Sequence, residues 1–383
     1  MSIKQIVKKV LNRQCQWMTS ELNACQKFAV WHRNRGMTKT DHFDKDGYRR
    51  YREYYKKYGL PAPKSEYEIF ASSLPKGAIV TPEIVVQNFL MPIMNPLDYR
   101  IYYEDKNNFE KILDPQWLPQ AVLRRIDGFF YDKDYLPLNS PDDTQLNAVL
   151  EASGFERFIL KPSVDSSSGV GIQMIKKEAD GDFTMNGKKL TIKALRKYGL
   201  NFIIQKSLLQ SDYMSQFNPT SVNTLRITTY RSVADNKVKI LWHILRIGAK
   251  GAIVDNAHAG GAFIGIGPDG TLGKYLKDQY NNTYTTHNGI DFSKSDFTIP
   301  EWGKALDFAC MVSDRLLHHR YVQLDVMIDN EGNPRLIEYN LGAASVWLGM
   351  MTGQTAFGEY SDEILSYCCA HKGEAKKVIY TIS

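Results

Sequence analysis

The stretch from residue 321 to residue 342 constrains the fold most strongly, because it reads as one long β-hairpin. Two apolar-rich runs, residues 322–328 and 335–340, flank the sequence Asp-Asn-Glu-Gly-Asn-Pro. Gly, Asn, Asp and Pro between two apolar runs are a strong turn signal. We therefore predict two antiparallel strands that are joined by a two-residue tip at Glu331-Gly332.

This register places Asp325 opposite Glu338 and Gln323 opposite Asn340. Side chains alternate along a strand, so these four polar side chains share one face of the hairpin. The opposite face is apolar and is expected to meet the core: Leu324, Val326, Ile328, Ile337 and Tyr339.

Two opposed carboxylates repel each other unless a cation lies between them. Carboxylate and amide oxygens without a nearby His or Cys suit a hard ion such as Mg²⁺, which in such sites usually also carries phosphate. The alternative is a polar face turned to water, and a register shift of one residue would also scatter the cluster. The hairpin alone leaves both interpretations open.

Length and composition indicate a globular protein. A chain of 383 residues predicts two or three domains with enough length to bury a core. The apolar runs are as short as strands, and charges interrupt the first 14 residues, so we expect neither a membrane span nor a signal peptide. The 5 cysteines show no metal-ligand spacing, which predicts reduced thiols in a cytoplasmic protein.

The positive charge is concentrated near the N-terminus. Residues 1–59 carry 14 Lys or Arg against 5 Asp or Glu, which leaves 34 against 37 for the rest of the chain. Because the body of the protein is nearly neutral, we expect no nucleic-acid groove through the main fold and no nucleic-acid partner.

Residues 1–35 read as one or two basic amphipathic helices, which either lie on an anionic membrane surface or pack on the protein itself. A second basic stretch, rich in tyrosine, spans residues 48–58 and is predicted to be helical as far as Gly59. Interleaved aromatic and basic residues can bind single-stranded nucleic acid by stacking. The other interpretation is that the tyrosines face the core and the charges face water.

Turn and breaker residues divide the rest of the chain. We predict four parts: a helical basic segment (1–60), an α/β subdomain (61–150), a small sheet-forming subdomain (151–210) and a C-terminal subdomain (211–383). Residues 101–106 read as the end of a strand, 107–113 as a helix, and 120–140, which include Arg124, Arg125 and Asp127, as loop-rich. Further strands are predicted at 155–162, 171–176, 201–206, 221–230, 238–247, 261–267 and 272–276, and helices at 191–198, 301–319 and 359–369. The pattern predicts an α+β fold with a mostly antiparallel sheet.

Lys161 and the loop that follows it form a second candidate constellation. The sequence Ser163-Val-Asp-Ser-Ser-Ser-Gly-Val-Gly171 lies between two strands. Small residues allow close backbone approach, their N–H groups can cradle phosphate oxygens, and Lys161 would add a point charge. No Gly-Lys-Ser/Thr follows, so this is not a Walker A loop. A flexible surface hairpin with an ordinary lysine is the alternative.

Two arginines on neighbouring strands are the third candidate. Arg226 lies in the apolar strand Asn-Thr-Leu-Arg-Ile at 223–227, and Arg246 lies in the next strand. Each is either paired structurally or directed at an anion. The glycine-rich turn at 255–261 could close over a substrate. The backbone N–H and C=O groups of the strand at 201–208 could bind the edge of an adenine ring.

The order of these motifs resembles the ATP-grasp enzymes, and in particular their sugar-transfer-associated branch. The motifs are Asp-Lys (105–106), Lys-Pro before the Ser/Gly loop (161–162), Gln-Lys (205–206), Asn-Thr-Leu-Arg-Ile (223–227), Asp-Asn before Gly-Gly (255–261) and Leu-Asp-Val with Leu-Ile-Glu-Tyr-Asn in the final hairpin. The resemblance covers roughly residues 100–350 and excludes the basic N-terminal extension. It implies an ATP-grasp fold, in which two α+β subdomains grip ATP.

The resemblance also implies roles for particular residues. Lys106 and Lys161 would hold phosphates, and the loop over the triphosphate would consist of Ser166, Ser167, Ser168, Gly169, Val170 and Gly171. The adenine hinge would be Gln205, Lys206, Ser207 and Leu208, with Asp212 at the ribose. A carboxylate usually stands where this sequence has Gln205. The magnesium ligands would be Asp325, Glu338 and Asn340, with Glu338 between two ions, and the catalytic residues would be Lys161, Arg226 and Arg246.

The function that the resemblance implies is ATP-dependent ligation of a carboxylate to an amine through an acyl phosphate, with ADP and phosphate as products. We expect an amino acid or amine to be joined to a sugar uronate or related carboxylate of a surface polysaccharide precursor. Phosphotransfer to a hydroxyl is one alternative. A non-catalytic nucleotide-binding module, recruited to a glycosyltransferase or to the inner face of the membrane through residues 1–59, is the other. The oligomeric state is left open.

Overall fold

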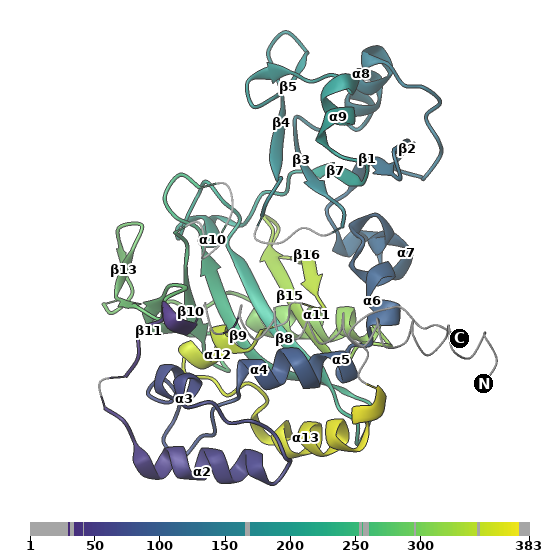
Figure 1. Ribbon diagram of the computed structural model, residues 1–383. Helices are drawn as coiled ribbons and strands as arrows, with labels where there is room; N and C mark the ends of the chain where they lie inside the picture. The colour runs from purple at the N-terminus through teal and green to yellow at the C-terminus, as the bar shows by residue number, and fades with distance from the viewer. Residues whose placement is uncertain are drawn as a thin grey trace, which may run out of the picture.

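The computed structural model describes residue 30 and residues 34–40, 42–164, 169–252, 255, 260–294, 296–342 and 345–374. The helices predicted for residues 1–35 lie almost entirely outside these ranges. The described chain forms two seven-stranded antiparallel sheets, with helices packed on both, and a separate two-stranded sheet (Figure 1). The prediction of an α+β fold with antiparallel sheets is confirmed.

The central sheet contains the predicted C-terminal hairpin. Its strand order is β12-β11-β10-β9-β8-β15-β16. The strands are β8 (Thr224–Arg231), β9 (Val238–Ile247), β10 (Ala262–Ile266), β11 (Leu272–Lys277), β12 (Thr283–Tyr284), β15 (Tyr321–Ile328) and β16 (Pro334–Asn340). All eight residues of β15 are buried, because helices cover both faces of the sheet at this strand.

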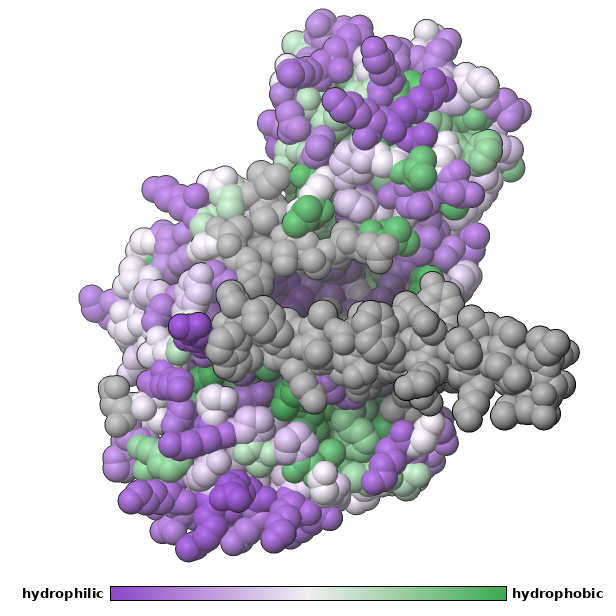
Figure 2. Space-filling model, viewed as in Figure 1, coloured by the Kyte–Doolittle hydropathy of each residue, from purple (hydrophilic) through white to green (hydrophobic). Residues whose placement is uncertain are grey.

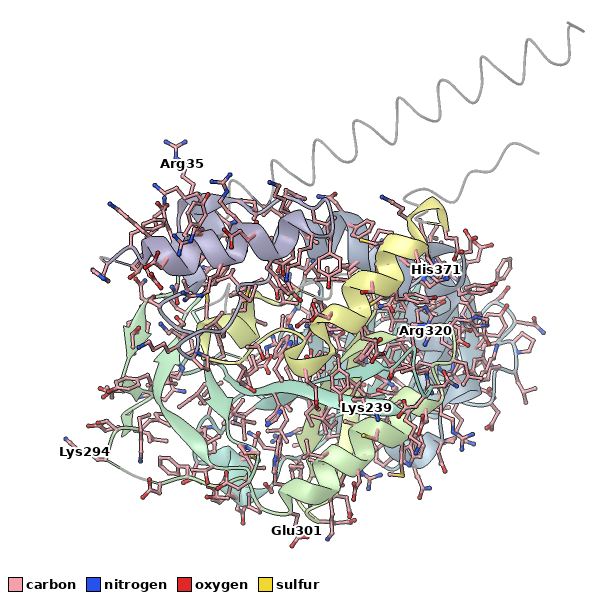
Figure 3. The ribbon with its side chains drawn as sticks, turned by 90° about the horizontal axis from the view of Figure 1, so that it is seen from below. Arg35, Lys239, Lys294, Glu301, Arg320 and His371 are labelled. Carbon is pink, nitrogen blue, oxygen red and sulfur yellow. The ribbon has the colours of Figure 1, made fainter. Side chains whose placement is uncertain are left out.

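One face of the central sheet packs against α11 (Trp302–Asp314). A second group of helices covers the opposite face: α2 (Lys45–Lys56), α3 (Lys64–Phe70), α4 (Glu83–Val85), η1 (Val86–Leu90), α5 (Met91–Met94), α12 (Trp347–Met351) and α13 (Ser361–Ala370). In Figure 3, which views the molecule from below, α2 and α13 cross in front of the sheet. One hydrophobic cluster therefore joins the chain before residue 95 to the chain after residue 229. The predicted division into four parts stays a prediction.

Helix α2 shows why the tyrosine-rich stretch folds as predicted. The Asp44 side chain caps the helix by accepting the Gly47 N–H, and Gly59 adopts a left-handed conformation (φ 66°) just beyond the C-terminus. Tyr51 and Tyr55 are buried in the shared cluster. The interpretation in which the tyrosines face the core is confirmed for these two residues.

The second sheet lies above the central sheet in Figure 1, in the order β2-β1-β7-β3-β4-β5-β6. Its strands are β1 (Ala121–Ile126), β2 (Phe129–Asp132), β3 (Arg157–Pro162), β4 (Gln173–Lys177), β5 (Phe183–Met185), β6 (Lys188–Lys189) and β7 (Phe202–Lys206). Helices α8 (Asp143–Ala152) and α9 (Ile192–Tyr198) cover one face through a separate hydrophobic cluster. Figure 2 shows a hollow with hydrophilic side chains between the two parts.

The segment that precedes the second sheet corrects two predictions. Residues 101–106 belong mostly to helix α6 (Leu97–Glu104), which begins directly after Pro96 and ends before the extended Asp105. Residues 120–140 are loop-rich only in their second half, because β1 and β2 form a hairpin across Asp127-Gly128, both at positive φ. The remaining elements are η2 (Lys106–Asn108), α7 (Phe109–Ile112), η3 (Pro115–Trp117), α10 (Asp212–Ser215), β13 (Thr286–His287), β14 (Ile290–Asp291), η5 (Gly358–Tyr360) and η6 (Lys372–Glu374).

Candidate functional site

The hairpin of β15 and β16 places the polar residues opposite one another as predicted. Gln323 lies opposite Asn340, and Asp325 lies opposite Glu338. Asn95 fastens the start of β15 to the chain that follows β16, because its amide donates to the carbonyl oxygens of Tyr321 and Leu341.

The route to this register differs from the prediction. The Asp329 N–H bonds the Asn333 carbonyl at 2.9 Å, so the tip is a three-residue loop with Gly332 at φ 81°. A β-bulge beyond Asp325 then shifts the register back by one residue. Leu336 is consequently the buried residue, while Ile337 is only partly buried, so the prediction that Ile337 lines the core face is wrong.

Asp325 is neutralised by two arginines from the neighbouring strands. Arg226 on β8 forms a bidentate pair with it, Nε to Oδ1 and Nη2 to Oδ2, both at 2.8 Å. Arg246 on β9 donates to Oδ2 at 3.0 Å. Burial favours a higher pKa for Asp325, but the two guanidinium groups outweigh it and hold the pKa below its usual value. Asp325 therefore has cationic partners within the chain, but these arginines lie on β8 and β9, on the side of β15 away from Glu338.

Asp255 is a further site residue that the sequence analysis mentioned only as part of a turn. It pairs with Arg246 at 3.1 Å and accepts the N–H of Thr224 at 3.2 Å and the hydroxyl of the same residue. Burial raises the pKa of Asp255, against the influence of Arg246. Arg246 thus bridges two buried carboxylates. The sequence signal was present, because a carboxylate follows an apolar strand that carries an arginine.

Lys106 and Lys161 converge on Glu338 from outside the central sheet. The Lys106 ammonium lies 3.5 Å from a Glu338 carboxylate oxygen, and the Lys161 ammonium donates to the Ile337 carbonyl at 3.4 Å. Burial and the nearby charge of Lys106 lower the pKa of Lys161 to about 8, although Glu338 opposes this shift. Because Lys161 belongs to β3, this contact joins the second sheet to the hairpin of β15 and β16.

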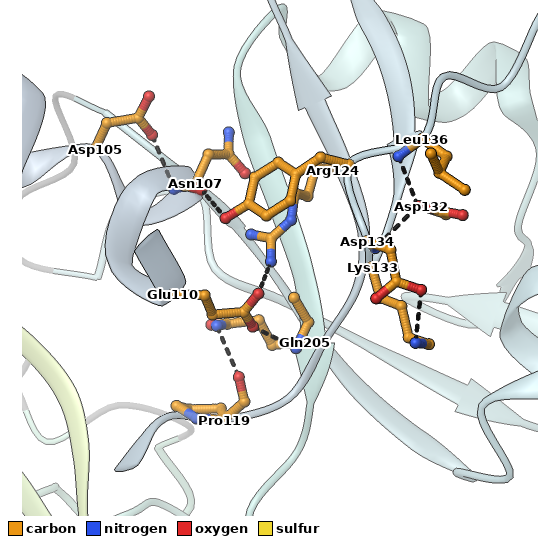
Figure 4. Close-up of polar contacts among 12 residues, drawn as sticks. Asp105, Asn107, Glu110, Pro119, Arg124, Asp132, Lys133, Asp134, Leu136 and Gln205 are labelled. Atoms are coloured by element: carbon orange, nitrogen blue, oxygen red, sulfur yellow. Dashed lines mark hydrogen bonds and ion pairs between the residues drawn. The ribbon is translucent and has the colours of Figure 1, made fainter. Parts of the chain in front are cut away.

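The strand β7 ends in the predicted adenine hinge. The Gln205 amide nitrogen donates to the Pro119 carbonyl at 3.0 Å, and within the described residues its buried oxygen Oε1 has no partner (Figure 4). The N–H groups of Lys206 and Ser207 are bonded to the carbonyls of Gln120 and Arg157. The hinge therefore holds an acceptor, Gln205 Oε1, in a fixed orientation.

A buried polar cluster next to this hinge was missed. Arg124 on β1 is fully buried, pairs with Glu110 of α7, and lies 4.2 Å from the ring centre of Tyr135 (Figure 4). Tyr135 has a positive φ of 63° and donates its hydroxyl proton to the Asn107 carbonyl. Arg124 and Lys161 lie opposite the same residue of β7, Ile203, and so share one face of the second sheet. An arginine within an apolar run was the available signal.

The remaining predicted residues are placed less centrally. Ser166, Ser167 and Ser168 lie outside the described residues, whereas Gly169, Val170 and Gly171 follow as an exposed turn. Gly171 adopts φ 84°, and its carbonyl accepts the Tyr198 hydroxyl. Lys206 directs its ammonium toward the ring of Phe155, at 4.7 Å, and Asp212 is exposed in the first turn of α10.

The donors of the hairpin fit a hard cation. They are two carboxylates and one amide oxygen, on adjacent strands. In the part of the chain that the structure describes, no group of three or more His, Cys, Asp or Glu could hold a metal ion. A cation here would therefore depend on an amide, and on phosphate or water, for part of its coordination.

Two antiparallel sheets that meet over paired lysines and a carboxylate hairpin define the ATP-grasp class. A family model described as sugar-transfer associated ATP-grasp matches residues 95–362. The chain belongs to this family and has an ATP-grasp fold, as the sequence motifs indicated. The matched range includes every predicted site residue and leaves out α2 to α5.

Similar solved structures include ADP-bound N5-carboxyaminoimidazole ribonucleotide synthetase, with 13% identity over 63% of this chain and 45% of that one (TM-score 0.36). D-cycloserine synthetase DcsG shows 13% identity over 73% of each chain (TM-score 0.38). The D-alanine–D-alanine ligase of Coxiella burnetii shows 9% identity over 71% of this chain and 59% of that one (TM-score 0.38). This chain thus spans less than half of the first of these proteins. No curated protein matches it.

Proposed function

We propose that this protein is an ATP-dependent carboxylate–amine ligase that forms an amide through an acyl phosphate and releases ADP and phosphate. The observation that carries the proposal is the convergence of four cations on one pair of carboxylates. Lys106 and Lys161 approach Glu338, while Arg226 and Arg246 hold Asp325. A site with this much positive charge can accept a triphosphate and a second anionic group together.

The nucleotide would lie between the two sheets. Gln205 Oε1 would accept a hydrogen bond from the adenine amino group. The backbone of Lys206, Ser207 and Leu208 would lie along the edge of the adenine ring. Guanine presents a carbonyl at the same position, so we expect the hinge to favour ATP over GTP. Lys106 and Lys161 would hold the phosphates, and residues 166–171 would cover them. Asp212 would reach the ribose.

Asp325, Glu338 and Asn340 would hold Mg²⁺, with Glu338 between two ions. The metal would neutralise charge on the phosphates and keep the γ-phosphoryl group in line for attack. When the nucleotide binds, its phosphate oxygens can replace the carboxylates as partners of the arginines and lysines. The cations that neutralise the phosphates are therefore already present in the chain. Glu338, whose side chain is about one-third exposed, is the more accessible of the two carboxylates.

In the reaction, a carboxylate oxygen of the substrate forms a bond to the γ-phosphorus and the bond to the ADP oxygen breaks. Arg226 and Arg246 stabilise the negative charge on the transferred group. The amine then forms a bond to the acyl carbon, phosphate leaves, and the amine loses a proton.

The substrates that we propose are an amino acid or similar amine and a sugar uronate or related carboxylate. The support for a saccharide is the description of the family as sugar-transfer associated. On this basis the reaction belongs to the synthesis of a surface polysaccharide, on the cytoplasmic side of the membrane.

The test is a screen of uronates and amino acids in pairs, with Mg·ATP and detection of phosphate. We expect ADP and phosphate only when both substrates are present, and hydroxylamine should trap a hydroxamate when the carboxylate is supplied alone. Release of AMP would refute the proposal. ADP formation with a sugar hydroxyl and no hydroxamate would indicate a phosphotransferase instead. Nucleotide binding without turnover on any pair would favour a non-catalytic module.

A further inference from the structure

The outer face of α2 carries more positive charge than any function proposed above requires. Exposed cations occupy six positions of the helix and its C-cap: Lys45, Arg49, Arg50, Arg52, Lys56 and Lys57. Three exposed acidic residues accompany them: Asp46 and Glu53 in the helix and the N-cap Asp44. Four of the cations recur at intervals of four, three and four residues and so follow one flank of the helix. These four line a groove of about 730 Å³ together with Tyr48, Glu53 and Leu60, so the groove has four cations and one carboxylate.

The helix is held rigidly, so this charge is a fixed array. Tyr51 and Tyr55 are 0% and 2% exposed, and they anchor the opposite flank in the core. The hydroxyls of Tyr54 and Tyr58 both donate to Asp362 of α13 at 2.7 Å. A ligand that binds the array therefore does not have to order the helix first.

The array is poorly neutralised by the protein itself. Arg49 pairs with Asp46 at 3.1 Å and Arg50 approaches Asp44 at 3.8 Å, but all four side chains are more than half exposed. Such exposed pairs contribute little free energy. Among the described residues, Lys45, Arg52 and Lys56 have no ion-pair partner, whereas the charge of Lys57 acts on Asp362 of α13. Arg52 and Lys57 lie over the rings of Tyr48 and Tyr54, both at 5.8 Å.

The position of α2 determines what can approach it. In Figure 1, α2 lies at the end of the molecule opposite the second sheet, and Figure 3 looks directly at the side that carries it. The chain beyond residue 59 has 34 basic and 37 acidic residues, whereas the described residues before it have 8 basic and 3 acidic. A negatively charged surface would therefore attract the α2 end and weakly repel the rest of the molecule.

We propose that α2 docks the protein on an anionic membrane surface, with lipid headgroups against the array and the nucleotide cleft facing away from the bilayer. A single-stranded nucleic acid is a poorer occupant, because stacking needs free aromatic faces and Tyr51 and Tyr55 are buried. The proposal does not depend on the reaction that the cleft catalyses.

The test compares two triple variants of the full chain by co-sedimentation with vesicles. One variant changes Lys45, Arg52 and Lys56 to Gln. The matched control changes Lys188, Lys193 and Lys197 to Gln, which removes the same charge from exposed positions of β6 and α9. Vesicles of phosphatidylcholine with and without one-third phosphatidylserine separate the charge effect from general adsorption. Circular dichroism confirms that both variants fold.

We expect the wild type to bind only the anionic vesicles and to be released by salt. A basic residue near such a surface is worth about a fivefold change in partition, so the α2 variant should bind about a hundredfold more weakly and the control nearly normally. Equal losses in both variants, or no loss in the α2 variant, would overturn the proposal. So would binding of the wild type to polyglutamate but not to anionic vesicles, which would indicate an acidic protein partner.

Discussion

Asp325 and Glu338 face each other across two strands, yet their surroundings differ. Asp325 is almost fully buried and is held by three hydrogen bonds from Arg226 and Arg246. Glu338 is partly exposed and has one looser contact, with Lys106. The two carboxylates therefore differ in role. Asp325 neutralises two buried guanidinium groups of the fold, whereas Glu338 can exchange its contact with Lys106 for another ligand.

This difference predicts unequal effects of charge removal on stability. Asp325→Asn leaves two buried guanidinium groups without their counterion and should lower the free energy of unfolding by about 3 kcal/mol. Glu338→Gln should lower it by less than about 1 kcal/mol, although as the proposed bridging ligand it should reduce turnover more. Urea denaturation of both variants without nucleotide measures the first effect. Equal destabilisation would show that the two carboxylates are equally structural.

His319 predicts a dependence of stability on pH. Burial, together with the positive neighbours His318 and Arg100, lowers the pKa of His319 to about 3. Between that value and the unfolded pKa of about 6.5, the unfolded chain binds a proton that the folded chain does not. The contribution of this group to stability is therefore complete above about pH 6.5 and decreases by up to about 1.4 kcal/mol per pH unit as the pH falls.

His319→Gln should remove this part of the slope, so that the variant loses less stability than the wild type between pH 7 and pH 5. Urea denaturation at several pH values gives the slopes. Parallel curves for the wild type and His319→Gln would contradict the assignment.

At the scale of elements, the hairpin of β15 and β16 reaches the predicted pairing by two departures that compensate each other. The three-residue tip shifts the register by one residue, and the bulge at Ile337 restores it. Because one residue of slip would turn the strand over, the bulge is what keeps Glu338 and Asn340 on the face of Asp325 while Leu336 enters the core.

This geometry predicts the order of two truncations. Leu336 is fully buried, so Leu336→Ala should cost about 2–5 kcal/mol of unfolding free energy. Ile337→Ala removes a partly buried side chain and should cost less than about 1.5 kcal/mol. An unbulged hairpin would give the reverse order. Thermal or urea denaturation of the two variants decides between these registers.

At the scale of the whole molecule, the site exists only where the two sheets meet. Lys161 and Gln205 come from the second sheet, whereas Asp325 and Glu338 come from the central one. Lys106 lies on the segment between them, and its N–H bonds the Ser163 carbonyl at 2.9 Å. A ligand that contacts all three parts would stabilise the folded protein by mass action.

We therefore expect Mg·ATP at a hundredfold its dissociation constant to raise the unfolding free energy by about 2.7 kcal/mol, which is a shift of several degrees in the midpoint of thermal unfolding. Lys161→Gln should remove most of this shift, and Lys188→Gln on β6 should retain it. A thermal-shift titration is sufficient. If Lys161→Gln kept the full shift in the unfolding midpoint, Lys161 would not be a nucleotide-binding residue.

The sequence by itself determined the antiparallel hairpin, the opposition of Asp325 and Glu338, and the order of the motifs, because alternation and turn residues are local properties of a chain. It also contained the Asp127-Gly128 turn signal that the loop prediction for residues 120–140 overlooked. Only the tertiary structure decided that Arg226, Arg246 and Asp255 form one charge network around Asp325, since these partners come from three separate segments. Burial likewise depends on which helices cover a sheet. No local sequence pattern therefore predicted that the side chains of Leu336, Arg124 and Lys161 would be buried.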